Sequence, residues 1–196
     1  LSGQTFSLND HVGERTVEKG YLPAGTIIAG ELEDTVGGGV SQFTTTLYNA
    51  VFWGGYEDVE HKPHSYYFSR YPEGVEATLN WRAPDLKFRN NTDNAILIDT
   101  LYTDTSITVR IFGENDGRTL KGEQSGGRSR AWADQEGGPA ALHVKGLVSD
   151  RFAVTDPPEP RYVPNPDLAV DEQHQTQTEL GGWSVTVTRR ILLGGD

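Results

Sequence analysis

Residues 37–55 read GGGVSQFTTTLYNAVFWGG and carry the clearest helical pattern in the chain. The apolar residues in this stretch recur at spacings of three and four, which places them on one face of a helix. They are Val40, Phe43, Leu47, Ala50 and Val51. Three glycines precede the pattern and two follow it, as helix start and stop signals do. The stretch therefore predicts a helix over Val40–Trp53.

The segments on either side of this helix favour β-structure. A short strand is expected upstream, at residues 26–29. Downstream, strands are expected at residues 66–70, 76–82, 95–102 and 107–112. The last two flank the turn residues 103–106 and form a predicted hairpin. This order predicts an α+β fold, mainly an antiparallel β-sheet with one principal helix after a Gly-rich loop.

Three regions differ in composition. Residues 1–113 hold the periodic segments and form the expected core. Residues 114–182 contain glycine pairs and a Pro-rich run, so we expect an irregular segment and an extended connector. Residues 183–196 begin with an apolar and polar alternation of period two, which predicts a closing strand. Its apolar face needs a partner, which the core would supply.

The charge of the chain restricts its partners. It has 28 acidic and 17 basic residues, for a net charge of −11 at pH 7. Such a surface repels phosphate, so nucleic-acid binding is excluded and anionic lipid surfaces are disfavoured. Because Cys is absent, disulfides and thiolate metal sites are excluded as well.

No targeting or membrane-spanning pattern occurs in this sequence. No run approaches the roughly 20 apolar residues of a transmembrane helix. The chain does not open with a signal peptide and contains no Met. We therefore expect it to be a piece of a longer protein, with any export signal or anchor upstream of Leu1.

A polar stripe runs along the predicted helix, opposite the apolar face. Ser41, Thr45 and Asn49 follow one another at intervals of four residues, directly after the Gly-rich loop. Glycines permit close backbone approach, and a helix start presents free N–H donors. We therefore expect a polar cleft here, with an arginine nearby to hold a carboxylate. The predicted ligand-binding residues are Gly38, Gly39, Gln42, Thr45, Asn49 and Arg70.

Ser41 has two readings. As the helix N-cap it would satisfy a backbone donor. As a nucleophile it would need a base, which His64 supplies in principle, and Asp85 would orient that base. The array Ser41–His64–Asp85 is thus the candidate catalytic set, and a buried His64 bonded to backbone is the alternative. No cofactor or metal site is predicted, because Pro63 separates His61 from His64 and a third ligand is not evident.

An aromatic cluster and three arginines accompany these residues. The cluster is Tyr66, Tyr67, Phe68 and Tyr71. Its members either stack on sugars or pack alternately into the core. Arg70, Arg82 and Arg89 either clamp a carboxylate or pair with local acidic residues.

Four stretches resemble the VanW family over roughly residues 5–113. They are FSLNDHVGERTVEKGYLPAGTI (6–27), the Gly-rich stretch 37–55, HKPHSYYFSRYPEGVEATLNW (61–81) and PDLKFRNNTDNAILI (84–98). The resemblance implies a bacterial cell-envelope protein, exported or membrane-anchored. Many members have Cys at the position of Ser41, so the chain resembles a Cys-lacking branch. The final GGWSVTVTRRI (181–191) is similar to a strand that follows the family core, or it begins a G5-like extension.

Two functions follow from these features. The first is an extracytoplasmic module that binds or scaffolds at peptidoglycan, a role that tolerates Ser in place of Cys. The second is an acyl-transfer or hydrolytic enzyme on peptidoglycan stem peptides that uses Ser41, His64 and Asp85. A purely structural spacer between other domains is a third reading.

Overall fold

The principal helix α2 spans Val40–Trp53, as the periodicity predicts. Gly39 is its N-cap and Gly54 its C-cap, so both glycine signals mark its ends. The computed structural model describes residues 1–28, 31–114, 123–125, 142–162, 164–175 and 180–193. Among these residues no helix is long and apolar enough to span a membrane.

A three-stranded antiparallel sheet lies beside α2, in the order β1 (Thr5–Ser7), β5 (Lys87–Arg89) and β4 (Glu57–Glu60). Phe6 pairs with Phe88, so the start of the chain is joined to a strand about 80 residues later. The short helix α1 (Leu8–Val12) follows β1 directly and buries Leu8.

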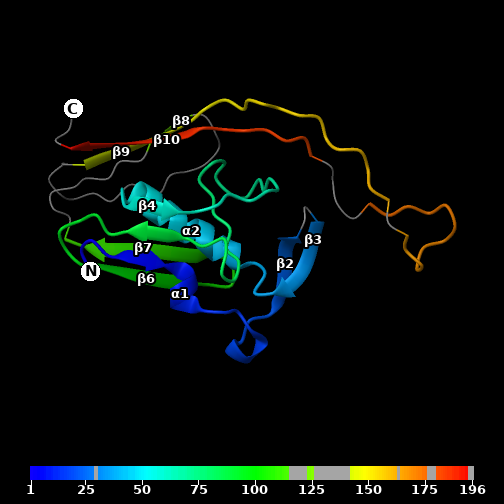
Figure 1. The fold of residues 1–196 in the computed structure, drawn as a ribbon, viewed down its shortest axis with the longest axis horizontal. Coiled ribbons are helices and arrows are strands. Elements are labelled where there is room, and N and C mark those ends of the chain that lie inside the picture. Colours follow the sequence, from blue (N-terminus) through cyan, green and yellow to red (C-terminus); the bar gives the residue numbers. More distant parts are fainter. Residues whose placement is uncertain (29–30, 115–122, 126–141, 163, 176–179, 194–196) are drawn as a thin grey trace.

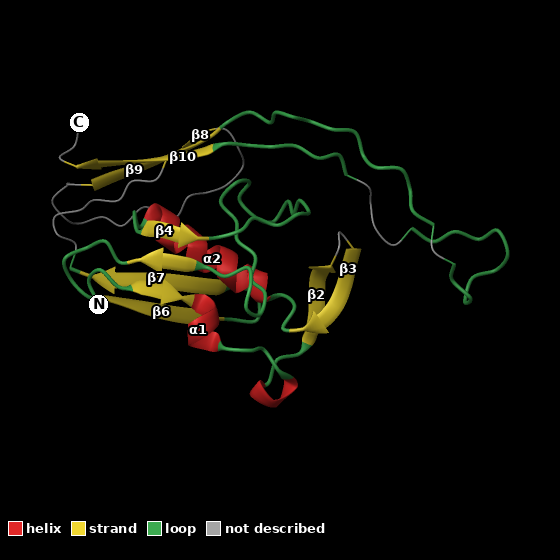
Figure 2. Ribbon diagram, in the orientation of Figure 1, coloured by secondary structure: helices red, strands yellow, loops and turns green. Residues whose placement is uncertain are grey.

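A hairpin of β6 (Ile96–Tyr102) and β7 (Ile107–Gly113) forms a second antiparallel sheet against α2 (Figure 2). Its turn is closed by the Thr103 N–H, which donates to the Ser106 carbonyl over 2.9 Å. The hairpin agrees with its prediction to within one residue at each end. It packs on the core through the four apolar residues that share one face, which are Ile96, Ile98, Val109 and Ile111.

A second hairpin, of β2 (Pro23–Ile28) and β3 (Glu31–Val36), leads into the Gly-rich loop. β2 pairs with β3, after a 3-10 turn at Val17–Lys19. Gly37-Gly38-Gly39 then lead from β3 into α2, and Gly37 and Gly39 both have positive φ. The glycines thus let the chain turn sharply from a strand into the helix.

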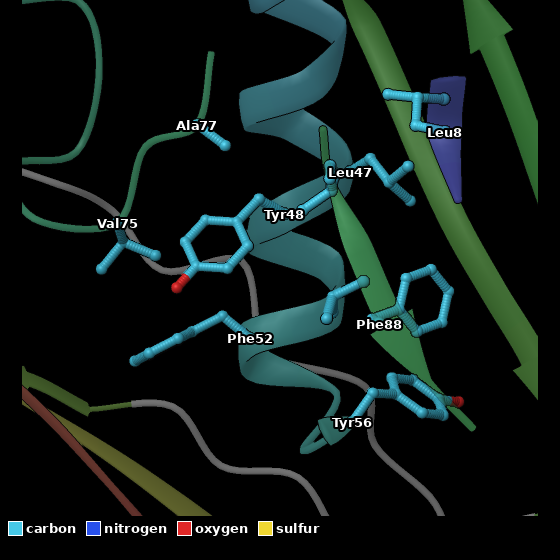
Figure 3. Close-up of a cluster of buried hydrophobic side chains, with 10 residues drawn as sticks. Leu8, Leu47, Tyr48, Phe52, Tyr56, Val75, Ala77 and Phe88 are labelled. Carbon is cyan, nitrogen blue, oxygen red and sulfur yellow. The ribbon is translucent and has the colours of Figure 1, made fainter. Parts of the chain in front are cut away.

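The hydrophobic core lies on both sides of α2 (Figure 3). Leu8, Tyr56 and Phe88 lie to one side of the helix, and Val75 and Ala77 lie to the other. Between them the helix contributes its own buried side chains, which are Leu47, Tyr48, Val51 and Phe52. One helix therefore holds together the sheet of β1, β5 and β4 and the irregular segment around residues 75–77.

The C-terminal part adds a separate three-stranded sheet of β8 (Glu123–Ser125), β9 (Leu142–Val148) and β10 (Val187–Leu193). β9 pairs antiparallel with β10 and parallel with β8. Strands β8 and β9 thus fall inside the range expected to be irregular. The glycine pairs at 126–127 and 137–138 lie outside the described residues.

The two ends of the connector between β9 and β10 lie near the core, whereas much of its length extends away from the rest of the chain (Figure 1). Residues 149–162 are exposed throughout, which includes the first three prolines of the Pro-rich run. After the connector, Trp183, Val185, Val187 and Arg189 are half-buried whereas the residues between them are exposed. This alternation of burial is the one that period-two patterning predicts.

Two strand predictions are wrong. Residues 66–70 and 76–82 form bends, turns and irregular chain. The fold class is nevertheless confirmed: the structure combines mainly antiparallel sheets with one principal helix.

Candidate functional site

The Gly-rich loop packs against β2. A Cβ added to Gly38 would lie 1.8 Å from the carbonyl oxygen of Ala24. The close approach that glycine permits is therefore made to the protein's own backbone. Gly39 caps α2 without any side-chain hydrogen bond, so the N-cap reading of Ser41 is wrong.

The polar stripe of α2 binds the segment 75–78. Ser41 Oγ and Thr78 Oγ1 share a hydrogen bond of 3.2 Å. Thr45 Oγ1 donates to the Ala77 carbonyl over 3.0 Å and accepts from the Ala77 N–H over 3.2 Å. Asn49 Nδ2 donates to the Val75 carbonyl over 2.8 Å. The stripe is therefore covered by protein backbone and does not form the floor of an open cleft.

The predicted ligand-binding residues are accordingly placed in different surroundings. Thr45 is only 3% exposed, so it contacts the chain itself. Gly39 and Gln42 are exposed near the start of the helix. Arg70 is exposed as well, with its guanidinium 4.8 Å from the ring centre of Phe68 and 5.0 Å from that of Tyr71.

Replacing Thr45 with valine tests this use of the stripe. Valine keeps the shape of the side chain but leaves the buried N–H and carbonyl of Ala77 without their partner. We expect the free energy of unfolding to fall by about 2 kcal/mol, measured by urea denaturation.

Thr46→Val is the matched control, because Thr46 Oγ1 donates to the Gln42 carbonyl of its own helix at an exposed position. Its expected change is within about 0.5 kcal/mol. Equal losses in the two variants would show that the stripe does not hold the segment 75–78.

Asp85 has a structural role. Its carboxylate accepts hydrogen bonds from Ser7 Oγ, at 2.6 Å, and from the backbone N–H groups of Asn9 and Leu86, at 2.9 and 2.7 Å. It thereby ties the start of α1 to the residue before β5. Among the described residues no hydrogen bond joins Asp85 to His64, or His64 to Ser41. The predicted array Ser41–His64–Asp85 is not assembled, because the oxygens of Asp85 are occupied by α1.

The carboxylate next to His64 is that of Glu76, and not that of Asp85 as predicted. The Nδ1 atom of His64 lies 2.8 Å from Glu76 Oε2. Both side chains are largely buried, at 7% and 12% exposure. The imidazole ring also stacks on Tyr71, with ring centres 5.1 Å apart, and meets the edge of Phe68 at 5.3 Å.

A second pair of imidazole and carboxylate lies nearby. His61 Nδ1 is 2.6 Å from Asp58 Oδ2, and the Tyr48 hydroxyl donates to the same oxygen over 3.2 Å. The Tyr48 ring stacks on His61, with centres 4.2 Å apart. Burial, and secondly the charge of Asp58, raises the pKa of Tyr48, so this hydroxyl stays protonated and donates at neutral pH.

Both pairs line one cleft with a volume of about 660 Å³. The first wall comes from α2, β4 and the segment 61–76. The second wall comes from residues 181–189 of the closing strand and the chain before it. Besides Tyr48 and Phe52 of α2, three more aromatic side chains line the same space, which are Tyr66, Tyr67 and Trp183.

Contacts across the cleft hold the second wall in place. Glu73 accepts two hydrogen bonds from Arg151, at 2.9 and 3.0 Å, and one from Trp183 Nε1 at 2.6 Å. The hydrogen bond from Arg151 is the main cause that lowers the pKa of Glu73. Arg189, which also lines the cleft, donates to the carbonyls of Phe52 in the last turn of α2 and of Tyr56 just after the helix, over 3.0 and 2.8 Å.

Among the described residues, no group of three or more His, Asp or Glu side chains is arranged to hold a metal ion. The cleft therefore offers aromatic faces, paired imidazoles and carboxylates, and one permanently charged side chain, Arg189.

Comparison with known proteins agrees with the resemblance. Residues 1–112 match the family model described as "VanW like protein". The chain is also similar to the uncharacterized protein YoaR of Bacillus subtilis (strain 168), with 38% identity over 112 residues. That match covers 57% of this chain and 37% of the relative, so the chain corresponds to little more than a third of that protein. No solved structure matches the chain.

Proposed function

Because the chain belongs to the VanW family over residues 1–112, we propose that it is an extracytoplasmic module that binds peptidoglycan in the cleft between α2 and the closing strand. The family membership suggests a cell-envelope protein. In this proposal the full-length protein is membrane-anchored or secreted, and the module holds it at the cell wall.

The composition of the cleft is the observation that carries the proposal. Tyr66, Tyr67 and Trp183 bring aromatic faces to a space that is also lined by carboxylates and imidazoles. Aromatic faces pack on the apolar faces of sugar rings, while the polar groups orient hydroxyls and amides by hydrogen bonding. A polymer of amino sugars and short peptides presents both kinds of surface.

Arg70 is the proposed contact for a stem carboxylate. Its guanidinium is exposed and rests on the rings of Phe68 and Tyr71, the same two rings that hold His64. An arginine held in this way presents its N–H groups with little further ordering, which favours a bidentate contact with a carboxylate.

Replacing Tyr66 with alanine tests the binding site. We expect the variant to bind soluble muropeptides about tenfold more weakly, a loss of about 1.4 kcal/mol, because an aromatic face of the cleft is removed. Isothermal titration calorimetry gives the Kd, and co-sedimentation with purified peptidoglycan gives an independent measure.

Tyr102→Ala is the matched control, because Tyr102 is 88% exposed on β6 and does not line the cleft. It should bind as the unaltered protein does. Loss of affinity in Tyr102→Ala with none in Tyr66→Ala would place the binding site elsewhere, and no binding by the unaltered protein would refute the proposal.

A further inference from the structure

His64 is held in a single orientation by three side chains. Glu76 bonds its Nδ1 atom, Tyr71 stacks on its ring and Phe68 meets the ring edge-on. An ionised carboxylate only accepts hydrogen bonds, so Nδ1 carries the proton in the neutral ring. The lone pair is then on Nε2, and His64 lines the cleft. This is the arrangement of an imidazole that is ready to accept a proton.

The carboxylate of this pair is positioned by α2. Val75 and Ala77, the neighbours of Glu76, are buried, and their carbonyls are bound by Asn49 and Thr45 of the helix. The Thr78 N–H donates to the Lys62 carbonyl over 2.8 Å, which aligns the segment of Glu76 with the segment of His64. The polar stripe of α2 therefore fixes the backbone on both sides of Glu76, so that a rigid helix positions the His64–Glu76 pair.

We propose that the cleft hydrolyses an amide bond in the peptide stem of its ligand, with His64 as the general base and Glu76 as its positioning residue. This inference rests on the proposed function for the identity of the ligand. His64 Nε2 takes a proton from a water molecule, whose oxygen forms a bond to the amide carbonyl carbon. The carbon–nitrogen bond then breaks, and the protonated imidazole returns the proton to the departing amine. The products are a carboxylic acid and an amine, with one water consumed.

Water is assigned as the nucleophile because, among the described residues, no serine is hydrogen-bonded to His64, including Ser65 and Ser184 of the cleft lining. The hydroxyl of Ser41 is bonded to Thr78 and is not among the groups that line the cleft. Arg189 supplies positive charge for the oxyanion of the tetrahedral intermediate. It lines the cleft and uses two of its five N–H groups on the carbonyls of Phe52 and Tyr56.

Purified muropeptides incubated with the full chain test this inference, with mass spectrometry of the products. We expect two fragments whose masses sum to that of the parent plus one water. Both His64→Gln and Glu76→Gln should lower kcat by about 10²-fold or more, with a much smaller change in the Kd for muropeptides. Glu76→Asp should recover part of the loss, because it keeps the carboxylate. His174→Gln is the control, since His174 is exposed on the connector.

The outcomes separate the two proposals. Muropeptide binding without cleavage by the unaltered chain overturns hydrolysis and leaves the binding function standing, whereas absence of binding overturns both. Cleavage that persists in His64→Gln overturns the role of His64. An acyl adduct on Ser41, seen by intact-protein mass spectrometry during turnover, overturns water as the nucleophile.

Discussion

Alanine in place of Gly38 is expected to lower the free energy of unfolding by about 3 kcal/mol or more. The added Cβ would lie 1.8 Å from the Ala24 carbonyl oxygen and 2.7 Å from Thr26 Oγ1. The first of these atoms belongs to the backbone of β2, so a rotamer change cannot relieve the contact. The hairpin of β2 and β3 has to move away from the start of α2. Urea denaturation gives the loss.

Gly39→Ala is the comparison that isolates this clash. Its Cβ would lie 3.6 Å from the nearest atom, which is an ordinary contact, but Gly39 has a φ of +79° that costs an L-residue about 1–2 kcal/mol. We therefore expect Gly38→Ala to lose more stability than Gly39→Ala. The opposite order would mean that the turn conformation, and not contact with β2, accounts for the triple glycine.

Methionine in place of Arg189 is expected to lower the free energy of unfolding by about 3 kcal/mol. The change keeps much of the apolar stem but removes the guanidinium, which lies 5.2 Å from the centre of the Phe52 ring and donates to the carbonyls of Phe52 and Tyr56. Phe52 belongs to the last turn of α2 and Tyr56 follows its C-terminal glycines, and both residues are buried. Loss of a charged donor therefore weakens the packing of β10 on this end of the core. Hydrogen exchange near residues 52–56 should increase together with the loss of stability.

Arg110→Met is the matched control for Arg189→Met, because Arg110 is exposed on β7. Its stability should change by less than about 0.5 kcal/mol. If Arg189→Met also behaves in this way, β10 does not dock on the core in solution. The closing strand would then be an independent extension, as the alternative reading of the sequence holds.

The parts of the fold that local sequence specifies were predictable. α2 has its apolar period and glycines at both ends, and the hairpin of β6 and β7 has alternation and a polar turn. In both, neighbours along the chain satisfy most of the backbone hydrogen bonds. The predicted first and last residues of these elements therefore agree closely with the observed ones.

The segment 76–82 failed as a strand prediction for a physical reason. Its alternation of burial is real, since Val75 and Ala77 are buried and Glu76 and Thr78 are less so. The backbone of Ala77, however, pairs with the side chain of Thr45 on a helix, and no strand of the described residues lies alongside the segment to form a ladder of hydrogen bonds. Periodicity reports which residues are buried, but it does not report what pairs with the backbone.

The candidate site was predictable only in part. His64 was identified from the residue type, but its acidic partner was not. Asp85 and Glu76 lie 21 and 12 positions after His64, and neither spacing distinguishes a capping carboxylate from one that orients a histidine. Trp183 belonged to a strand that alternation revealed, yet its place in the cleft depends on contacts with Glu73 more than 100 residues earlier.

The hydrogen bonds from Arg189 to residues 52 and 56 also determine when the cleft can form during synthesis of the chain. Arg189 and Phe52 are separated by 137 positions along the chain. At roughly 5–20 residues per second, a ribosome needs about 7–27 s to add the residues between them. Once residue 76 has been added, and for the rest of that interval, the growing polypeptide contains the residues of the first wall of the cleft but not those of the second. Contacts of such long range form late in folding, so the ability to hold a ligand is acquired only when nearly the whole chain has emerged.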